Sequence, residues 1–173
     1  DDCRSGSFAN LIEAVERVGV GPFRGEFLAS STGELDWQWL LEEASPRAVF
    51  HLAAVTDTTV ADERSMLEDN VEGFRELLEM CVASGTPLVY ASSAATYGSP
   101  PQGASREAFP EEAAGAPNNV YGFSKWQMEN LHRRIAAQRA ASGEGPPHVV
   151  GLRYFNVFGP GEARKGKIGR AHV

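Results

Sequence analysis

The chain has 173 residues, of which 42% are hydrophobic and 23% are charged, and it carries a formal net charge of −7. This length suffices for one domain with a hydrophobic core, and the composition is that of a globular protein. Scattered Lys and Arg in an acidic chain argue against a nucleic-acid partner, and no apolar run approaches the roughly 20 residues of a membrane span. Cys3 and Cys81 form neither a disulfide pattern nor a metal-ligand spacing, which favours a reducing cytoplasm and no metal site.

Apolar runs bounded by Pro, Gly or Ser predict strands, and apolar residues at helical spacing predict helices. The longest helical pattern places Leu67, Val71 and Phe74 on one face, and Gly85 is a typical C-terminal stop. In chain order, the patterns predict helix 8–18, helix 36–44, strand 47–54, helix 59–83, strand 86–94, helix 121–142 and strand 148–160.

Alternating strands and helices are the signature of right-handed parallel crossovers, so we expect an α/β layered sheet. Ligands of such sheets bind outside the carboxyl ends of the strands. The segments 51–59, 91–98 and 155–162 should therefore line one rim. The Pro- and Gly-rich stretch 99–119 is predicted to be a loop, and loops of this length are often functional.

Tyr121 and Lys125 stand four residues apart at the start of a predicted helix. Positions i and i+4 share one helix face, so the phenol and the ammonium should lie side by side. A fixed cation favours the phenolate, which would make the pair an acid/base. The alternative is a surface tyrosine that packs along a lysine stem.

Other rim residues also admit two interpretations. Ser92 and Ser93 follow a strand and either hydrogen-bond a substrate or cap a turn. Ala53 and Ala54 either let a ligand approach the backbone or provide tight packing. Lys165 lies in a cationic segment that either reaches an anion or is a solvated loop charge.

Four motifs, in order and spacing, resemble the extended short-chain dehydrogenase/reductase family of nucleotide-sugar enzymes. They are "HLAA", "YASSAATYG", "VYGFSK" and "LRYFNVFGPGE". Within that family the motif set is similar to the ADP-glyceromanno-heptose 6-epimerases. The resemblance implies a Rossmann-like, doubly wound parallel sheet over residues 1–167.

The resemblance also implies catalytic roles. Ser93 matches the family's catalytic serine, Tyr121 its base, and Lys125 the lysine that binds the nicotinamide ribose and favours the phenolate. Lys165 matches the second acid/base of the heptose enzymes, on the opposite face of the sugar. Asn156 matches an asparagine that contacts the substrate, as Ser93 and Lys165 also do.

Further positions match the family's cofactor-binding residues. Asn70 matches a helix asparagine that braces the strand ends, and Phe155 and Val157 match residues that flank the nicotinamide. Asp1 and Asp2 match the acidic end of the second strand, beside the adenosine ribose. The remaining matches lie at and just after the end of the first predicted strand, and in the family they line the cofactor pyrophosphate and ribose: Leu52, Ala53, Ala54, Val55 and Thr56.

The implied reaction interconverts ADP-D-glycero-D-manno-heptose and ADP-L-glycero-D-manno-heptose through a 6-keto sugar, with enzyme-bound NADP and no net redox change. Such an enzyme supplies heptose for the lipopolysaccharide core. NAD is the alternative cofactor, because the choice depends partly on a glycine-rich turn that this sequence does not contain. Many relatives are homo-oligomers that assemble through two long helices, here 59–83 and 121–141.

Two features depart from the family pattern. The first strand, the phosphate-binding glycine turn and the C-terminal substrate domain are missing, so we expect the chain alone to be a truncated piece that folds poorly and has little activity. The residues 168–173 leave the family sequence abruptly and match a translation of a common sequencing adapter; we expect them to be a non-native tail.

Two alternative functions remain. A UDP-hexose 4-epimerase or another nucleotide-sugar epimerase or dehydratase uses the same scaffold, although Ala94 and Ala95 lack the acidic residues typical of dehydratases. A non-catalytic nucleotide-binding protein is the second, although such proteins often lose the catalytic residues that Ser93, Tyr121 and Lys125 match.

Overall fold

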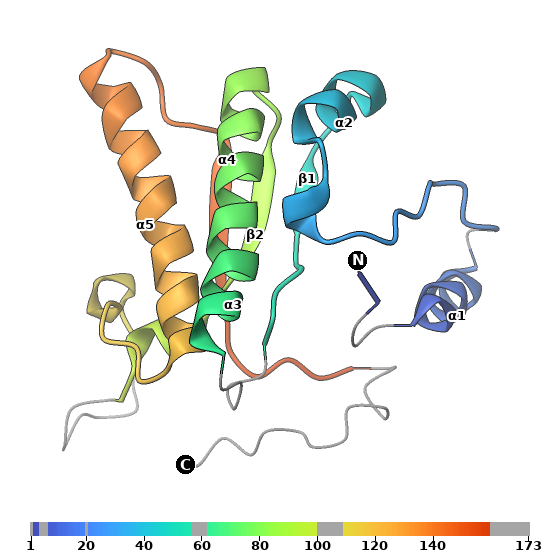
Figure 1. Ribbon diagram of the computed structural model, residues 1–173, viewed down its shortest axis with the longest axis horizontal. Coiled ribbons are helices and arrows are strands. Elements are labelled where there is room, and N and C mark those ends of the chain that lie inside the picture. Colours follow the sequence, from blue (N-terminus) through green and yellow to red (C-terminus); the bar gives the residue numbers. More distant parts are fainter. Residues whose placement is uncertain (1, 4–6, 20, 57–61, 100–108, 160–173) are drawn as a thin grey trace. The chain divides into compact units, whose positions relative to one another are not determined.

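The computed structural model describes residues 2–3, 7–19, 21–56, 62–99 and 109–159 (Figure 1). The chain divides into two compact units. The larger unit runs from Ser30 to Phe155, and the smaller one consists of Asp2–Ala29 and the segment from Asn156 onward. All three strands belong to the larger unit.

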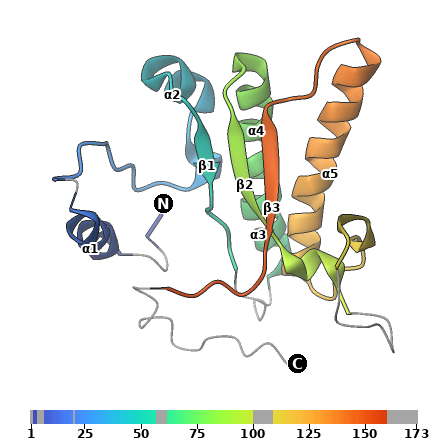
Figure 2. The same cartoon turned by 180° about the vertical axis from the view of Figure 1, so that it is seen from behind.

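The sheet of the larger unit is parallel, with the order β1-β2-β3. Its strands are β1 (Val49–His51), β2 (Leu88–Ser93) and β3 (Val149–Tyr154), which lie side by side in Figure 2. The α/β class and the parallel strand direction predicted from the sequence are thereby confirmed. Each strand is shorter than its apolar run, because only part of each run pairs with a neighbouring strand.

Three helices cover one face of this sheet, as both views show (Figures 1 and 2). They are α2 (Trp37–Ala44), α4 (Gly73–Ser84) and α5 (Val120–Ala141). Asp36 begins α2 by accepting a hydrogen bond from the Trp39 amide, as expected of an N-cap aspartate.

The predicted helix 59–83 is not continuous α-helix. Its described part consists of α3 (Glu63–Leu67), a π-helical turn η2 (Glu68–Glu72) and α4. Residues 57–61 lie outside the described part of the chain. The stop predicted at Gly85 is confirmed: its φ of +71° is the left-handed conformation that glycine adopts without steric cost.

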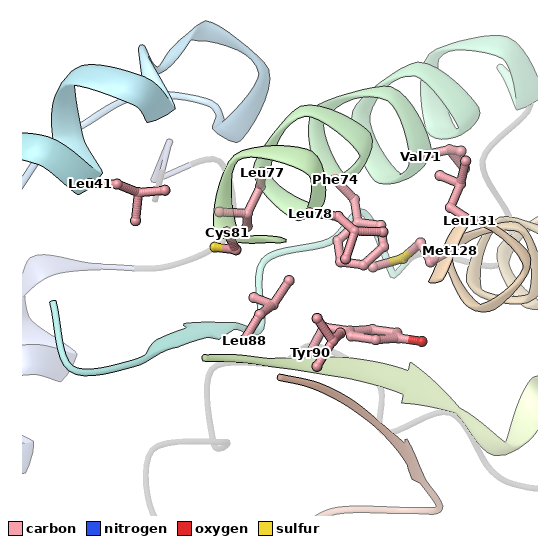
Figure 3. Close-up of a cluster of buried hydrophobic side chains, with 11 residues drawn as sticks. Leu41, Val71, Phe74, Leu77, Leu78, Cys81, Leu88, Tyr90, Met128 and Leu131 are labelled. Atoms are coloured by element: carbon pink, nitrogen blue, oxygen red, sulfur yellow. The ribbon is translucent and has the colours of Figure 1, made fainter. Parts of the chain in front are cut away.

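The hydrophobic core lies between the sheet and these helices (Figure 3). Side chains of α4 point onto β2, and side chains of α5 close one side. Phe74 stacks between His51 and Tyr90, with ring centroids 5.5 and 4.7 Å away. The buried members are Leu41, Val71, Phe74, Leu77, Leu78, Cys81, Leu88, Tyr90, Met128, Leu131 and Val149.

The opposite face of the sheet is apolar and open. Side chains alternate between the two faces of a strand, and the outward positions on β1 and β3 include Phe50 at 69% exposure, Val150 at 52% and Leu152 at 41%. Among the described residues of the larger unit, no helix covers this face. The unit therefore has a single helical layer and a core on one side only.

The smaller unit contains α1 (Phe8–Val18), which has the bounds predicted from the sequence. Ser7 caps its N-terminus and Gly19 its C-terminus, and Phe8 packs edge-on against Phe27 with centroids 5.1 Å apart. An open, mainly apolar groove of about 610 Å³ lies between α1 and the segment 21–23. No helix in the described ranges is long and apolar enough to cross a membrane.

We expect the open sheet face to dominate the surface hydrophobicity of this chain. Replacing both Phe50 and Leu152 with Lys puts two charges on that face without altering the core. Binding of a fluorescent hydrophobic dye should therefore fall severalfold, with an unchanged far-ultraviolet circular dichroism spectrum.

Trp39→Lys is the matched control, because Trp39 is 55% exposed on α2 rather than on the sheet. This variant should bind nearly as much dye as the unaltered chain. Equal dye binding by the unaltered chain, the double variant and Trp39→Lys would contradict the prediction that the exposed sheet face is the main dye-binding surface.

Candidate active site

Tyr121 lies in the first turn of α5, directly after the N-cap. Asn119 Oδ1 accepts a hydrogen bond from the Gly122 amide at 2.8 Å, which satisfies one of the free donors at the start of the helix. The predicted helix start is thus confirmed to within one residue. Tyr121 is half-buried, and Lys125 one turn later is almost completely buried, with 1% of its surface exposed.

Gly122 allows this turn of α5 to contact the end of β2. A Cβ at Gly122 would stand 2.6 Å from the carbonyl oxygen of Ala95, closer than real Cβ atoms approach. Ala95 belongs to the short helix η3 (Ala94–Tyr97), which begins immediately after Ser93. The glycine of the "VYGFSK" motif therefore places Tyr121 beside the turn that follows Ser93.

Lys125 spans the interior to reach the sheet. Its Nζ donates to the carbonyl oxygen of Ala91 on β2 at 2.8 Å and lies 6.0 Å from the centre of the Tyr121 ring. Burial lowers the pKa of Lys125 from 10.5 to about 8, so the ammonium form still predominates at neutral pH. An ammonium has three N–H donors, and Ala91 is its one hydrogen-bond acceptor within the described ranges.

Asn70 ties the segment after β1 to α5. Its Oδ1 accepts from the Val55 amide at 2.7 Å, and its Nδ2 donates to the Val55 carbonyl at 3.0 Å and to Ser124 Oγ at 3.1 Å. Ser124 in turn donates to the Tyr121 carbonyl at 2.8 Å. The Asn70 side chain thus links the segment after β1 to α5, and its predicted role beside the cofactor stays a prediction.

His51, the last residue of β1, is buried and neutral near pH 7. Burial, together with the charge of Lys125, lowers the pKa of His51 to about 4. The ring stacks on Phe74, with centroids 5.5 Å apart. His51 therefore adds no positive charge near Lys125 above pH 5.

The two serines that end β2 differ in their partners. Ser92 is buried and donates to Glu129 Oε1 at 2.5 Å, so its hydroxyl is used within the fold. Ser93 is partly exposed, and its Oγ accepts from the Ala95 amide at 3.1 Å. That capping bond uses one lone pair and leaves the Ser93 hydroxyl proton available to donate. No hydrogen bond joins Ser93, Tyr121 and Lys125 to one another within the described residues.

The segment after β1 presents small side chains and open backbone. Leu52 is 61% exposed, Ala53 and Thr56 are exposed, and Ala54 and Val55 are half-buried. The exposure of Ala53 argues against tight packing at that position, whereas half-buried Ala54 remains open to both interpretations.

Phe155 follows β3 and joins an aromatic group on the rim. Its ring centroid lies 6.3 Å from that of Tyr97 and 5.9 Å from that of Phe109. The long loop contributes Phe109 to this group, and Phe155 is 58% exposed.

Several predicted site residues lie outside the larger unit or outside the described residues. Asp1 and Lys165 lie outside the described residues. Asp2, Asn156 and Val157 are exposed and belong to the smaller unit, so their predicted roles stay predictions. Within the described ranges, no group of three or more His, Cys, Asp and Glu residues could hold a metal ion.

Sequence reasoning missed a buried ion pair beside the site. Glu129 on α5 and Arg153 on β3 meet at 2.7 Å, with side chains 8% and 12% exposed. The available signal was an arginine inside an otherwise apolar strand, since a charge in such a run requires a buried partner.

The sequence matches the model of a family described as the NAD dependent epimerase/dehydratase family over residues 27–172. The solved ADP-L-glycero-D-manno-heptose-6-epimerase of Helicobacter pylori is 33% identical, with a TM-score of 0.68, and the match covers 94% of this chain and 45% of that one. The UDP-glucose 4-epimerase of Brucella ovis, solved in complex with NAD, is 31% identical, with a TM-score of 0.58 and coverages of 76% and 39%.

The UDP-Glc/GlcNAc 4-epimerase of Campylobacter jejuni has a TM-score of 0.72 at 23% identity, with coverages of 90% and 44%, and this likeness shows the fold alone. The chain spans less than half the length of each of these three proteins. The family expected from the four motifs is confirmed.

Lys125→Met should stabilise the protein at pH 7. The fall in pKa from 10.5 to about 8 corresponds to roughly 3 kcal/mol against the buried charged form. Because the folded pKa lies below the unfolded one, this penalty is complete below pH 8 and disappears as pH rises toward 10.5. Urea denaturation across this pH range should show a gain for Lys125→Met that shrinks over the same interval.

Arg134→Met is the matched control, since Arg134 is an exposed cation on the same helix. It should change the free energy of unfolding by less than about 0.5 kcal/mol at every pH. A loss of stability in Lys125→Met at pH 7 would show that the hydrogen bond to Ala91 outweighs the cost of burial.

Proposed function

Because the chain belongs to the NAD dependent epimerase/dehydratase family, we propose that the protein carrying it is a nucleotide-sugar epimerase that inverts C6 of an ADP-heptose. The observation that carries the proposal is the pair on α5. Tyr121 stands beside the turn after Ser93, and Lys125 is buried one helical turn away with its ammonium against β2.

Two observations favour the heptose over a hexose as substrate. The motif set around Ser93, Tyr121 and Lys165 is similar to that of the heptose enzymes, and the Helicobacter pylori heptose epimerase is 33% identical over 94% of this chain. A UDP-hexose 4-epimerase is the second candidate. It is favoured by the 31% identity to the Brucella ovis enzyme, over 76% of this chain.

The rim residues fit a nicotinamide dinucleotide. The open backbone of 52–54 accepts close approach of a large polar ligand, and Val55 is held in place by Asn70. The ammonium of Lys125 has two donors to offer the hydroxyls of a ribose. When bound, this group supplies reversible oxidation of the sugar carbon; we propose NADP, with NAD as the alternative.

The chain's own residues would handle the proton. In the proposed roles, Tyr121 is the acid/base on one face of the sugar and accepts the proton of the sugar hydroxyl there, or returns it in the reverse direction. The charge of Lys125 favours the phenolate form of Tyr121. The Ser93 hydroxyl donates a hydrogen bond to the same sugar oxygen and stabilises it when that oxygen becomes a carbonyl. Glycine at 122 keeps these groups on adjacent elements.

A second acid/base is needed if the proton is exchanged on the opposite face of the sugar. We assign this role to Lys165, which lies outside the described residues, on its match to the heptose enzymes. Asn156 is proposed to contact the substrate, and Phe155 and Val157 to flank the nicotinamide. Asp1 and Asp2 are proposed to lie beside the adenosine ribose.

The decisive assay uses the full-length protein that contains this chain. Incubation with ADP-D-glycero-D-manno-heptose should invert C6, as followed by proton NMR, without net accumulation of reduced cofactor. If the heptose is unchanged and UDP-galactose turns over instead, the substrate belongs to the 4-epimerase branch. If neither ADP-D-glycero-D-manno-heptose nor UDP-galactose turns over, the result would favour a non-catalytic nucleotide-binding protein.

Tyr121→Phe and Lys165→Ala separate a two-base from a one-base mechanism. Loss of either acid/base should lower kcat by on the order of 10²–10⁴-fold, because each proton transfer then lacks its partner. Lys167→Ala is the matched control, a neighbouring lysine with no assigned role, and should keep full kcat. Unchanged turnover in Lys165→Ala would rule out the two-base assignment and leave Tyr121 as the only base.

A further inference from the structure

A cluster of polar side chains joins α5 to the end of β2 and to β3. We define the Glu129 cluster as Glu129, Ser92, Arg153, Arg133 and Tyr97. Ser92 and Glu129 are buried, the Arg153 side chain is 12% exposed, Tyr97 is half-buried and Arg133 is exposed. Glu129 is at its centre: its Oε1 accepts from Ser92 Oγ at 2.5 Å and from Arg153 Nε at 2.9 Å. Its Oε2 accepts from Arg153 Nη2 and from Arg133 Nη2, both at 2.7 Å. Each carboxylate oxygen of Glu129 thus accepts two hydrogen bonds.

Arg153 extends the cluster toward the rim. Its Nη1 donates to the Tyr97 hydroxyl at 3.0 Å and to the carbonyl of Glu111 at 2.7 Å. The guanidinium carbon also lies 4.9 Å from the centre of the Tyr97 ring. One side chain on β3 therefore contacts α5, η3 and the loop beyond it.

The ion pair is not an efficient source of stability. Removing both charges from water costs several kcal/mol per ion, and an apolar pair of similar volume is often at least as stable. Burial raises the pKa of Glu129, but hydrogen bonds from Arg153 and Ser92 and the nearby charges hold that pKa below its ordinary value. The carboxylate therefore stays ionised, and its two parallel hydrogen bonds to the planar guanidinium restrict the relative placement of α5 and β3.

That placement determines how α5 meets the residues before Ser93. Lys125 holds the carbonyl of Ala91, and Glu129, one helical turn later, holds the hydroxyl of Ser92. Arg153 is the register partner of Ser92 across the sheet. The two residues preceding Ser93 are therefore fixed against the helix that carries Tyr121.

We propose that Arg153 and Glu129 are positioning residues of the active site. Their paired hydrogen bonds hold the end of β2 and η3 in place, and this keeps Ser93 close enough to Tyr121 for both to contact the same sugar oxygen. This role rests on the proposed function for its catalytic consequence. Neither residue touches the reacting atoms. Both act through Ser92 and through Tyr97, whose ring belongs to the rim aromatic group.

The test uses the full-length protein and the double variant Glu129→Leu/Arg153→Met, which replaces the ion pair by apolar side chains of similar size. We expect a similar melting temperature, because the apolar pair removes the desolvation cost. Amide hydrogen exchange in η3 should rise on the order of tenfold, with exchange in α4 unchanged. With the nucleotide sugar, kcat should fall roughly 10–100-fold and KM stay within about threefold, as expected of misplaced catalytic groups.

The matched control removes a different ion pair from α5. Arg139 and Glu144 pair at 2.8 Å at the other end of this helix, and Arg139→Met/Glu144→Leu should leave kcat and η3 exchange unchanged. Arg153→Lys keeps the charge but loses the planar fork, and it should reproduce the increase in η3 exchange if the double variant fails to fold. Full kcat and unchanged η3 exchange in a folded double variant would overturn the positioning role.

The two hypotheses fail separately. A wild-type protein that turns over neither ADP-heptose nor UDP-hexose contradicts the proposed function, while η3 exchange still decides whether the cluster positions β2. A wild-type protein that is active, together with a double variant that is equally active, contradicts the positioning role alone.

Discussion

The candidate site depends on the way α5 is held against β2. Two polar side chains one helical turn apart make this contact: Lys125 reaches the carbonyl of Ala91, and Glu129 reaches the hydroxyl of Ser92. Both groups are buried, so neither contact can be exchanged for water without cost. The start of α5 and the end of β2 are thereby fixed together, and Tyr121 and Ser93 occupy those two positions.

Buried charge of this kind acts against stability, and the core compensates for it. Phe74, Leu77 and Leu78 on α4 have no exposed surface, and they pack onto Leu88 and Tyr90 of the central strand. Full burial of each large apolar side chain contributes about 1.5–3 kcal/mol. A core on one side of a three-stranded sheet thus supports a rim where an ammonium, a carboxylate and a guanidinium are all removed from water.

The position of the site follows from topology. In a parallel sheet all carboxyl ends lie along one edge, so segments distant in sequence meet there. Asn70 is an example, because its side chain hydrogen-bonds to Val55 after β1 and to Ser124 on α5. The chain spans less than half the length of the three solved epimerases to which it is similar. The sheet face that carries Phe50 and Leu152 is exposed.

Local patterns determined the positions of most helices and strands, the parallel sheet and the pair of Tyr121 and Lys125, because helical spacing and apolar runs are properties of neighbouring residues. Gly85 could be read as a helix stop for the same reason. Tertiary structure alone decided that the Ser92 hydroxyl donates within the fold while the Ser93 hydroxyl keeps its proton available to donate. The tertiary structure likewise placed a π-helical turn, Glu68–Glu72, in the described part of the predicted helix 59–83, and Asn70 in this turn is buried. It also decided that Glu129 and Arg153, 24 residues apart, form a buried fork. Such pairings depend on which residues the sheet brings together, and no local pattern contains that information.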